Sequence, residues 1–174
     1  VFDGLWDPYG DKHMGNCAET CARHYDFSRE AQDEYARMSY ERARRSAEDG
    51  TFAAEIVPVE VPGRRGKVTV VDADEEPHKA NLDKMASLRP AFDREGSVTA
   101  ANASGINDGA AGVLLMSADD AEKRGIEPLA RIASYATAGL DPSIMGVGPI
   151  YASRKALDKA DDDTTVIALA EDVA

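Results

Sequence analysis

The stretch that most constrains the fold of this chain is residues 96–116, GSVTAANASGINDGAAGVLLM. It places small residues around Ser104, Asn107 and Asp108 and then continues into the apolar segment 112–116. A loop of Gly, Ala and Ser lets a ligand approach the main chain closely, because few side chains stand in the way. We therefore expect a ligand-facing loop that leads into a buried strand at 112–116.

Apolar residues at helical spacing and matching end signals predict several helices. Ser28 is a good N-cap for a long helix, and Gly50 follows its expected end. Ser117 and Gly125 bound a shorter helix in the same way, and Pro149 suits the first position of another. The predicted helices are residues 14–25, 29–48, 82–87, 118–124 and 149–159.

Runs rich in β-branched residues predict strands at 55–61 and 67–71, joined by a turn of sequence PGRRG. Residues 72–79 are expected to form an acidic loop, and residues 130–137 and 166–169 two further strands. Strands that alternate with helices indicate an α/β core. The first hundred residues instead favour an irregular α+β insertion.

Composition excludes some classes of partner. The net charge is −12, from 20 basic and 32 acidic side chains among 174 residues, which argues against a general nucleic-acid or anionic-membrane surface. No apolar run approaches the length of a membrane span. Cys17 and Cys21 are too few for a disulfide framework and fit a reducing compartment. The chain begins with Val1, which is consistent with a processed, cleaved or partial polypeptide.

Small residues and polar groups come together at a few places where chemistry could occur. The segment 9–15, YGDKHMG, precedes a predicted helix whose first N–H groups could bind a carbonyl or phosphate. Composition alone favours the alternative that His13 and Met14 pack at a loop corner. The Ser104 hydroxyl could bond an amide-bearing ligand, although Asn107 and Asp108 beside it are more commonly capping residues. No nearby base would activate Ser104 as a nucleophile.

Two other features carry a weaker functional hypothesis. Cys17, Cys21 and His24 could share a helix face, but three ligands on one helix make a poor zinc site. We expect two small buried thiols instead. Met145 lies in a Gly/Pro loop, DPSIMGVGP, where ordinary packing is the default expectation.

Three segments nevertheless occur in one order that resembles the thiolase family: LRPAFDREG at 88–96, the 96–116 stretch, and DPSIMGVGPIYASRKAL at 141–157. Thiolases are acyl-CoA acyltransferases that make or cleave 3-oxoacyl-CoA. The resemblance runs from about Phe2 to Lys159 and implies an incomplete α/β, thiolase-like fold. Residues 1–106 resemble the α+β loop domain that covers CoA. Residues 107–127 resemble the end of the N-terminal βαβαβαββ half, and 128–174 the start of the C-terminal half.

The resemblance also implies a set of ligand contacts. Coenzyme A or acyl-CoA would be the substrate, with no covalently bound cofactor and no metal. The residues that match CoA-lining or acyl-lining positions of the family are Leu5, His13, Met14, Leu88, Phe92, Ala100, Ser104 and Met145.

The sequence departs from the family at the positions of the chemistry. The nucleophilic cysteine is expected before Val1 and the segments with the base residues after Ala174, and Cys17 and Cys21 match non-catalytic positions. Where the family has Asn-Glu-Ala-Phe, this chain has Ala-Glu-Asp-Val at 170–173. At the CoA mouth, Pro77 stands where the family often has Arg. We therefore expect no catalytic residue in this chain.

Two functions follow from the resemblance. In the first, the chain is a fragment or subunit of a thiolase-type acyl-CoA C-acyltransferase, which catalyses Claisen condensation or thiolysis of 3-oxoacyl-CoA. It would act in an oligomer and only together with other thiolase polypeptide, in the cytoplasm or the mitochondrial matrix. The alternative is a catalytically inactive, thiolase-derived structural or assembly subunit.

Overall fold

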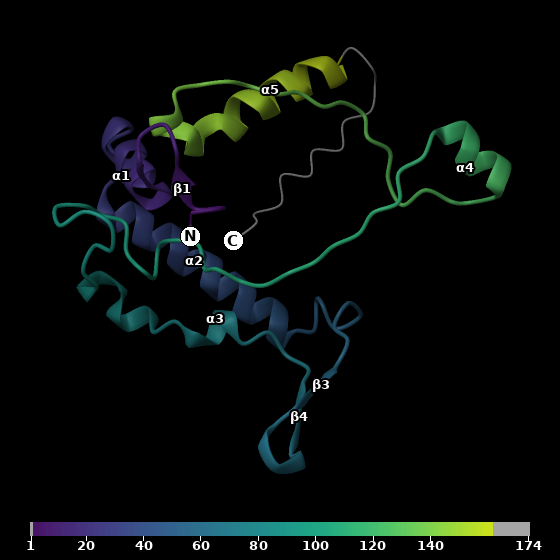
Figure 1. The fold of residues 1–174 in the computed structure, drawn as a ribbon, viewed down its shortest axis with the longest axis horizontal. Helices are drawn as coiled ribbons and strands as arrows, with labels where there is room; N and C mark the ends of the chain where they lie inside the picture. The colour runs from purple at the N-terminus through teal and green to yellow at the C-terminus, as the bar shows by residue number, and fades with distance from the viewer. Residues whose placement is uncertain (1, 162–174) are drawn as a thin grey trace. The chain divides into compact units, whose positions relative to one another are not determined.

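The computed structural model describes residues 2–161 (Figure 1). The chain divides into two compact units. Unit 1 contains the residues up to Lys12 and those from Gly105 onward, and unit 2 contains His13–Ser104. The predicted boundaries at residues 106 and 127 stay a prediction.

Two helices form the body of unit 2. Helix α1 spans Met14–His24, and its N-cap His13 accepts a hydrogen bond from the main-chain N–H of Gly15. Helix α2 spans Arg29–Glu48 and begins at Ser28, whose hydroxyl accepts the N–H of Ala31 at 3.1 Å. Both caps satisfy main-chain donors that the first helical turn leaves free. The predicted helices at 14–25 and 29–48 are confirmed.

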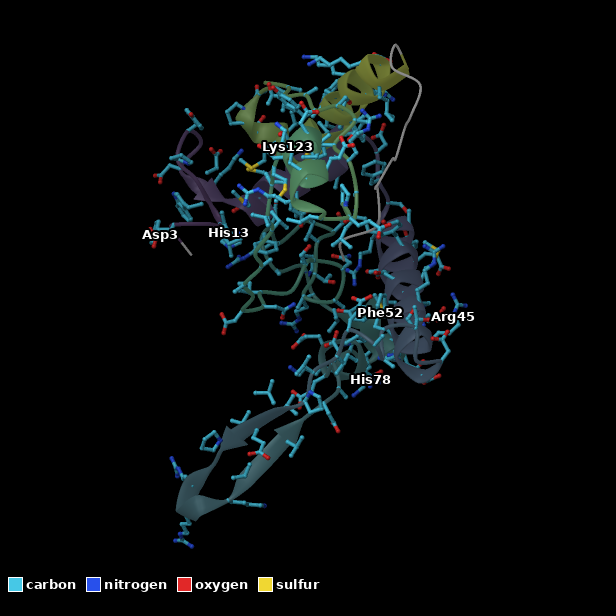
Figure 2. The ribbon with its side chains drawn as sticks, turned by 90° about the vertical axis from the view of Figure 1, so that its right-hand side faces the viewer. Asp3, His13, Arg45, Phe52, His78 and Lys123 are labelled. Atoms are coloured by element: carbon cyan, nitrogen blue, oxygen red, sulfur yellow. The ribbon has the colours of Figure 1, made fainter. Side chains whose placement is uncertain are left out.

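A hairpin leads away from these helices in both views (Figures 1 and 2). Strand β3 (Val59–Pro62) pairs antiparallel with β4 (Val68–Val71), with Val59 opposite Val71. The turn η1 (Arg64–Gly66) contains Arg65 at φ 59° and Gly66 at φ 74°, a left-handed pair that reverses the chain tightly. The hairpin is confirmed, but its first strand begins at Val59 and leaves 55–58 as turn and coil.

Short helices follow the hairpin. Helix α3 spans Glu76–Lys79, within the segment 72–79 that was predicted to be an acidic loop. The loop prediction is therefore wrong for these four residues. Pro77 lies within its first turn, where the missing N–H costs no helical hydrogen bond. The 3₁₀ helix η2 (Leu82–Ser87) confirms the helix predicted there, and it carries Met85, a core residue that is 1% exposed.

Unit 1 contains the remaining elements. Strands β1 (Trp6–Asp7) and β2 (Lys12–His13) form a two-stranded sheet, and β2 ends in the first residue of unit 2. Helix α4 (Ala118–Arg124) begins at the Ser117 cap and ends at Gly125, which is left-handed at φ 64°. The 3₁₀ helix η3 (Pro142–Val147) runs directly into α5 (Gly148–Asp161). The helices predicted at 118–124 and 149–159 are confirmed, the second with a start one residue earlier.

The strands predicted at 112–116 and 130–137 are wrong for the structure described here. Both segments are without regular structure, and Leu114 and Tyr135 are each 79% exposed. A strand needs a neighbour for its main-chain N–H and C=O groups, and no described segment pairs with either one. The strand predicted at 166–169 lies outside the described residues. Within residues 2–161, no helix is long and apolar enough to cross a membrane.

Candidate functional site

The residues predicted to contact CoA divide between the two units. Unit 1 carries Leu5 and Met145, and both are half-buried. The others belong to unit 2, where the site can be followed contact by contact: His13, Met14, Leu88, Phe92, Ala100 and Ser104.

His13 and Phe92 lie against each other at the N-terminus of α1. Their rings stack with centroids 4.9 Å apart and an angle of 25° between the planes. His13 Nδ1 accepts the Gly15 N–H at 2.9 Å, so Nε2 is the ring nitrogen that carries a hydrogen. Figure 2 labels His13 beside the strand that leads into α1. The structure thus brings together two predicted residues that are far apart in sequence.

Helix α1 fixes Phe92 from two directions. A Cβ atom placed on Gly15 would lie 2.3 Å from the Phe92 ring, so the ring occupies the space that a side chain would need. Asn16 Nδ2 donates to the Phe92 carbonyl oxygen at 3.0 Å. Ring and main chain are therefore both held in place, and Met14 begins the same helix one residue after His13.

A buried carboxylate holds the segment that precedes the Ser104 loop. Glu19 on α1 is 1% exposed, and its oxygens accept the N–H groups of Ser97 at 2.9 Å and Val98 at 2.8 Å. A Cβ atom on Gly96 would lie 2.2 Å from Glu19 Oε1. Sequence reasoning missed Glu19. Its signal was spacing, because Glu19 follows Gly15 by one helical turn and precedes Ala22 by another on the small-residue face of α1.

Ala100 lies inside a tight turn at residues 99–103, and Ser104 follows this turn directly. Thr99, which is fully buried, accepts the Ala103 N–H at its carbonyl oxygen, 3.0 Å away. Asn102 Oδ1 accepts the Thr99 N–H at 2.6 Å, so a side chain of the turn also bonds to its first residue. Ala100 and Ser104 are both exposed, so a ligand could reach them.

Leu88 follows η2 and is 37% exposed. The Arg29 guanidinium on α2 donates to its carbonyl oxygen at 3.1 Å. The position of Leu88 is therefore set by α2, whereas that of Phe92 is set by α1.

Met145 lies in η3 of unit 1. Asp141 caps this 3₁₀ helix by accepting the Ser143 N–H at 2.8 Å. That hydrogen bond, with a smaller contribution from the charge of Lys12, lowers the pKa of Asp141 below its ordinary value. The cap is consequently an ionised carboxylate at neutral pH.

The prediction of two buried thiols is confirmed only for Cys17. Cys17 is 2% exposed and Cys21 is half-buried on α1, and neither forms a disulfide. Among residues 2–161, no group of three His, Cys, Asp or Glu side chains is arranged to hold a metal ion.

A separate cavity of about 620 Å³ lies at the C-terminal end of α2. Its wall includes Ala47, Phe52 and Ile56, with Asp72 and Asp74 also among the lining residues. Pro77, which stands at the position predicted to lie at the CoA mouth, also lines this cavity, whereas none of the eight predicted CoA contacts does.

Comparison with known proteins assigns this scaffold to a class. The model of the thiolase N-terminal domain matches residues 1–119, and that of the thiolase C-terminal domain matches residues 126–172. The chain belongs to the thiolase family, as its motifs predicted, and its fold is a partial α/β thiolase.

Individual relatives agree with this assignment. Over 161 residues the chain is 58% identical to the acetyl-CoA acetyltransferase of Paracoccus denitrificans and 57% identical to that of Shinella zoogloeoides. The crystal structure of the Bacillus anthracis acetyl-CoA acetyltransferase is similar with a TM-score of 0.82 and 46% sequence identity. Each of these matches covers 92% of this chain and 41% of the relative. The chain therefore spans well under half the length of these proteins.

Proposed function

We propose that this chain supplies CoA-contacting loops to a thiolase-type acyl-CoA C-acyltransferase that condenses acetyl-CoA or cleaves 3-oxoacyl-CoA. The observation that carries the proposal is the stack of His13 on Phe92, locked by Gly15 and Asn16. It joins two predicted ligand contacts into one fixed wall at the start of α1. The acetyl-CoA acetyltransferases at 58% and 57% identity support the same substrate class.

In this proposal each residue has a simple role. Met14, Leu88 and Phe92 offer apolar surface to the pantetheine arm, and Ala100 leaves room beside it. Ser104 offers an exposed hydroxyl to an amide of the arm. Leu5 and Met145 contact the pantetheine or acyl end. CoA enters and leaves as substrate and is not a resident cofactor.

We assign no catalytic residue to the described part of the chain. Acyl transfer of this kind needs a reactive thiolate that can reach the thioester carbonyl. Cys17 is 2% exposed within α1, and both Cys17 and Cys21 match non-catalytic positions of the family.

Further thiolase polypeptide would complete the active enzyme, as an oligomer. The exposed apolar side chains of the segment after Ser104 support this, since such surfaces mark contacts with other chain segments. They are Ile106, Val113, Leu114 and Leu115. We propose the loop domain at 1–106, the end of one thiolase half at 107–127 and the start of the other at 128–174. The bacterial origin of the relatives supports a cytoplasmic location.

A chimera tests the activity directly. This chain replaces the matching segment of the Paracoccus denitrificans relative, and release of free CoA from two molecules of acetyl-CoA is measured as acetoacetyl-CoA forms. We expect an active chimera. Ser104→Trp should abolish most of its activity, because the indole fills the space beside the loop. Ser153→Trp, on the exposed side of α5, is the matched control.

Calorimetric titration of CoA into the 174-residue chain tests ligand binding alone. We expect saturable binding that Ser104→Trp weakens and Ser153→Trp leaves unchanged. A folded chain and a folded chimera that both fail to bind CoA would overturn the proposal.

A further inference from the structure

A continuous line of hydrogen bonds on α2 connects the two loops that carry the proposed CoA contacts of unit 2. We propose that Arg29, Asp33 and Asn102 are positioning residues that fix the Leu88 segment relative to the Thr99–Ala103 turn. The two loops then present their ligand contacts as one rigid unit. This inference rests on the proposed function, because it names residues that tune the same CoA site without touching the ligand.

The first half of the line runs from Arg29 to the Leu88 segment. The guanidinium donates to the carbonyl oxygens of Met85 at 2.7 Å and Leu88 at 3.1 Å. Met85 is 1% exposed, so this end is anchored in the core. A guanidinium has several donors in one rigid plane and stays charged, which lets it hold two carbonyl groups and a carboxylate at once.

Asp33 is the link between the two halves. One carboxylate oxygen, Oδ2, accepts Arg29 Nε at 2.8 Å, and the other, Oδ1, accepts Asn102 Nδ2 at 2.9 Å. Arg29 and Asp33 lie one turn apart on the same face of α2, and their side chains are 21% and 14% exposed. Partial burial reduces solvent screening, which strengthens these charge-assisted bonds compared with a surface pair.

The second half runs from Asn102 into the turn. Its Nδ2 also donates to the Ser97 carbonyl oxygen at 3.0 Å, and its Oδ1 accepts the Thr99 N–H at 2.6 Å. One amide side chain therefore closes the turn and ties it to α2. Ala100 lies inside this turn and Ser104 follows it directly, so their positions depend on Asn102.

This arrangement predicts that the two loops are coupled through Asp33. Arg29 and Asn102 bond to different oxygens of one carboxylate, so a change at either should be felt at the other loop through Asp33. Such coupling must be reciprocal. Arg29→Gln should loosen the Thr99–Ala103 turn, and Asn102→Ala should loosen the Leu88 main chain.

Amide hydrogen exchange in the ligand-free 174-residue chain tests this coupling. The reporters are the amides of Thr99, Ala103 and Leu88, each hydrogen-bonded in the structure. We expect Arg29→Gln to speed exchange at Thr99 and Ala103 by about tenfold, and Asn102→Ala to do the same at Leu88. Arg44→Gln is the matched control, because Arg44 on α2 also donates to two carbonyl oxygens, those of Pro77 and Ala80.

The Tyr25 amide serves as a reporter for a global loss of structure. It donates to the Cys21 carbonyl oxygen at the end of α1, so faster exchange there indicates that the helix itself has loosened. If Arg29→Gln also speeds exchange at the Tyr25 amide, the test is repeated with Arg29→Lys. Lysine keeps the charge beside Asp33 but cannot hold both carbonyl groups. If the exchange rate of the Thr99 amide in the Arg29 variant lies within about twofold of its rate in the Arg44→Gln control, the coupling is overturned.

A double-mutant cycle in CoA affinity then tests the positioning role. We expect Arg29→Gln and Asn102→Ala each to weaken CoA binding about tenfold, as for one charge-assisted hydrogen bond. The double variant should lose little more than either single one, because both changes break the same line. Losses that multiply to about a hundredfold would overturn the positioning role. If the unaltered chain binds no CoA, the proposed function fails, and the exchange experiment still decides whether the loops are coupled.

Discussion

The carboxylate of Glu19 accepts the main-chain N–H of Val98 at 2.8 Å, although the two residues are 79 positions apart in sequence. The same carboxylate accepts the Ser97 N–H at 2.9 Å and is 1% exposed. Burial of a charge is tolerated only when hydrogen bonds replace those of water. This contact ties α1 to the segment that leads into the Thr99–Ala103 turn.

Glu19→Gln should therefore destabilise the chain markedly. Both carboxylate oxygens face main-chain N–H groups, so either orientation of a glutamine turns its NH₂ group towards a donor. We expect a loss of about 2–4 kcal/mol in the free energy of unfolding, measured by urea titration. Glu34→Gln, on the exposed side of α2, should change it by less than about 0.5 kcal/mol. Equal effects of the two substitutions would contradict this interpretation of Glu19.

Gly15→Ala tests how closely Phe92 packs on α1. The new methyl group would lie 2.3 Å from the ring, and we expect a loss of about 1–3 kcal/mol from overpacking. The midpoint of thermal unfolding, followed by circular dichroism, measures the effect. Phe92→Leu introduced together with Gly15→Ala should recover part of the loss, because a smaller side chain makes room for the methyl group.

The control for that substitution is Gly109→Ala, since nothing lies within 4 Å of a Cβ atom at Gly109. It should leave the unfolding midpoint unchanged or raise it slightly, because alanine restricts the unfolded chain more than glycine does. A Gly15→Ala variant as stable as Gly109→Ala would show that Phe92 moves aside freely.

Local signals in the sequence predicted α1, α2, η2, α4 and α5, but they missed α3 and η3. Ser28, Ser117 and Gly125 fixed helix ends because each acts on main-chain groups only a few residues away. Local signals could not decide whether residues 112–116 form a strand. Its apolar residues meet the requirement for a buried strand, but pairing depends on a neighbour that no described segment supplies.

The candidate site was predictable mainly from motif resemblance. That resemblance selected both His13 and Phe92, but no local pattern could indicate that their rings stack. The Asp33–Asn102 hydrogen bond was missed for a similar reason. Asp33 lies in a helix rich in charges, where the ordinary expectation for an acidic residue is a solvated face or a bond to a neighbour one turn away. Contacts across the fold require the tertiary structure.

Ser28→Ala should weaken α2 at its start. The Ser28 hydroxyl accepts the Ala31 N–H, and its loss leaves that donor without a protein partner. We expect a loss of about 1 kcal/mol in the free energy of unfolding, whereas Ser28→Asp should retain the cap. Urea titration of both variants measures the difference. If Ser28→Asp is as unstable as Ser28→Ala, the hydroxyl is not acting as a cap.

Asp93 should make part of the stability depend on pH. Its carboxylate accepts the Glu95 N–H at 3.1 Å and pairs with Arg23 at 3.0 Å. These partners, the Glu95 N–H first, lower the pKa of Asp93 in the folded chain below its ordinary value of 3.8. A lowered pKa means that the folded state favours the ionised form, so the extra stability is present above 3.8 and is lost as the pH falls through the lowered value.

We expect Asp93→Asn to be less stable than the unaltered chain at neutral pH, with a difference that shrinks once the pH falls below 3.8. Urea titrations at a series of pH values measure this difference. Arg23→Gln separates the two causes, because it leaves the Glu95 N–H in place and should retain most of the pH dependence. A gap between Asp93→Asn and the unaltered chain that stays constant down to acid pH would mean that ionisation of Asp93 contributes nothing to folding.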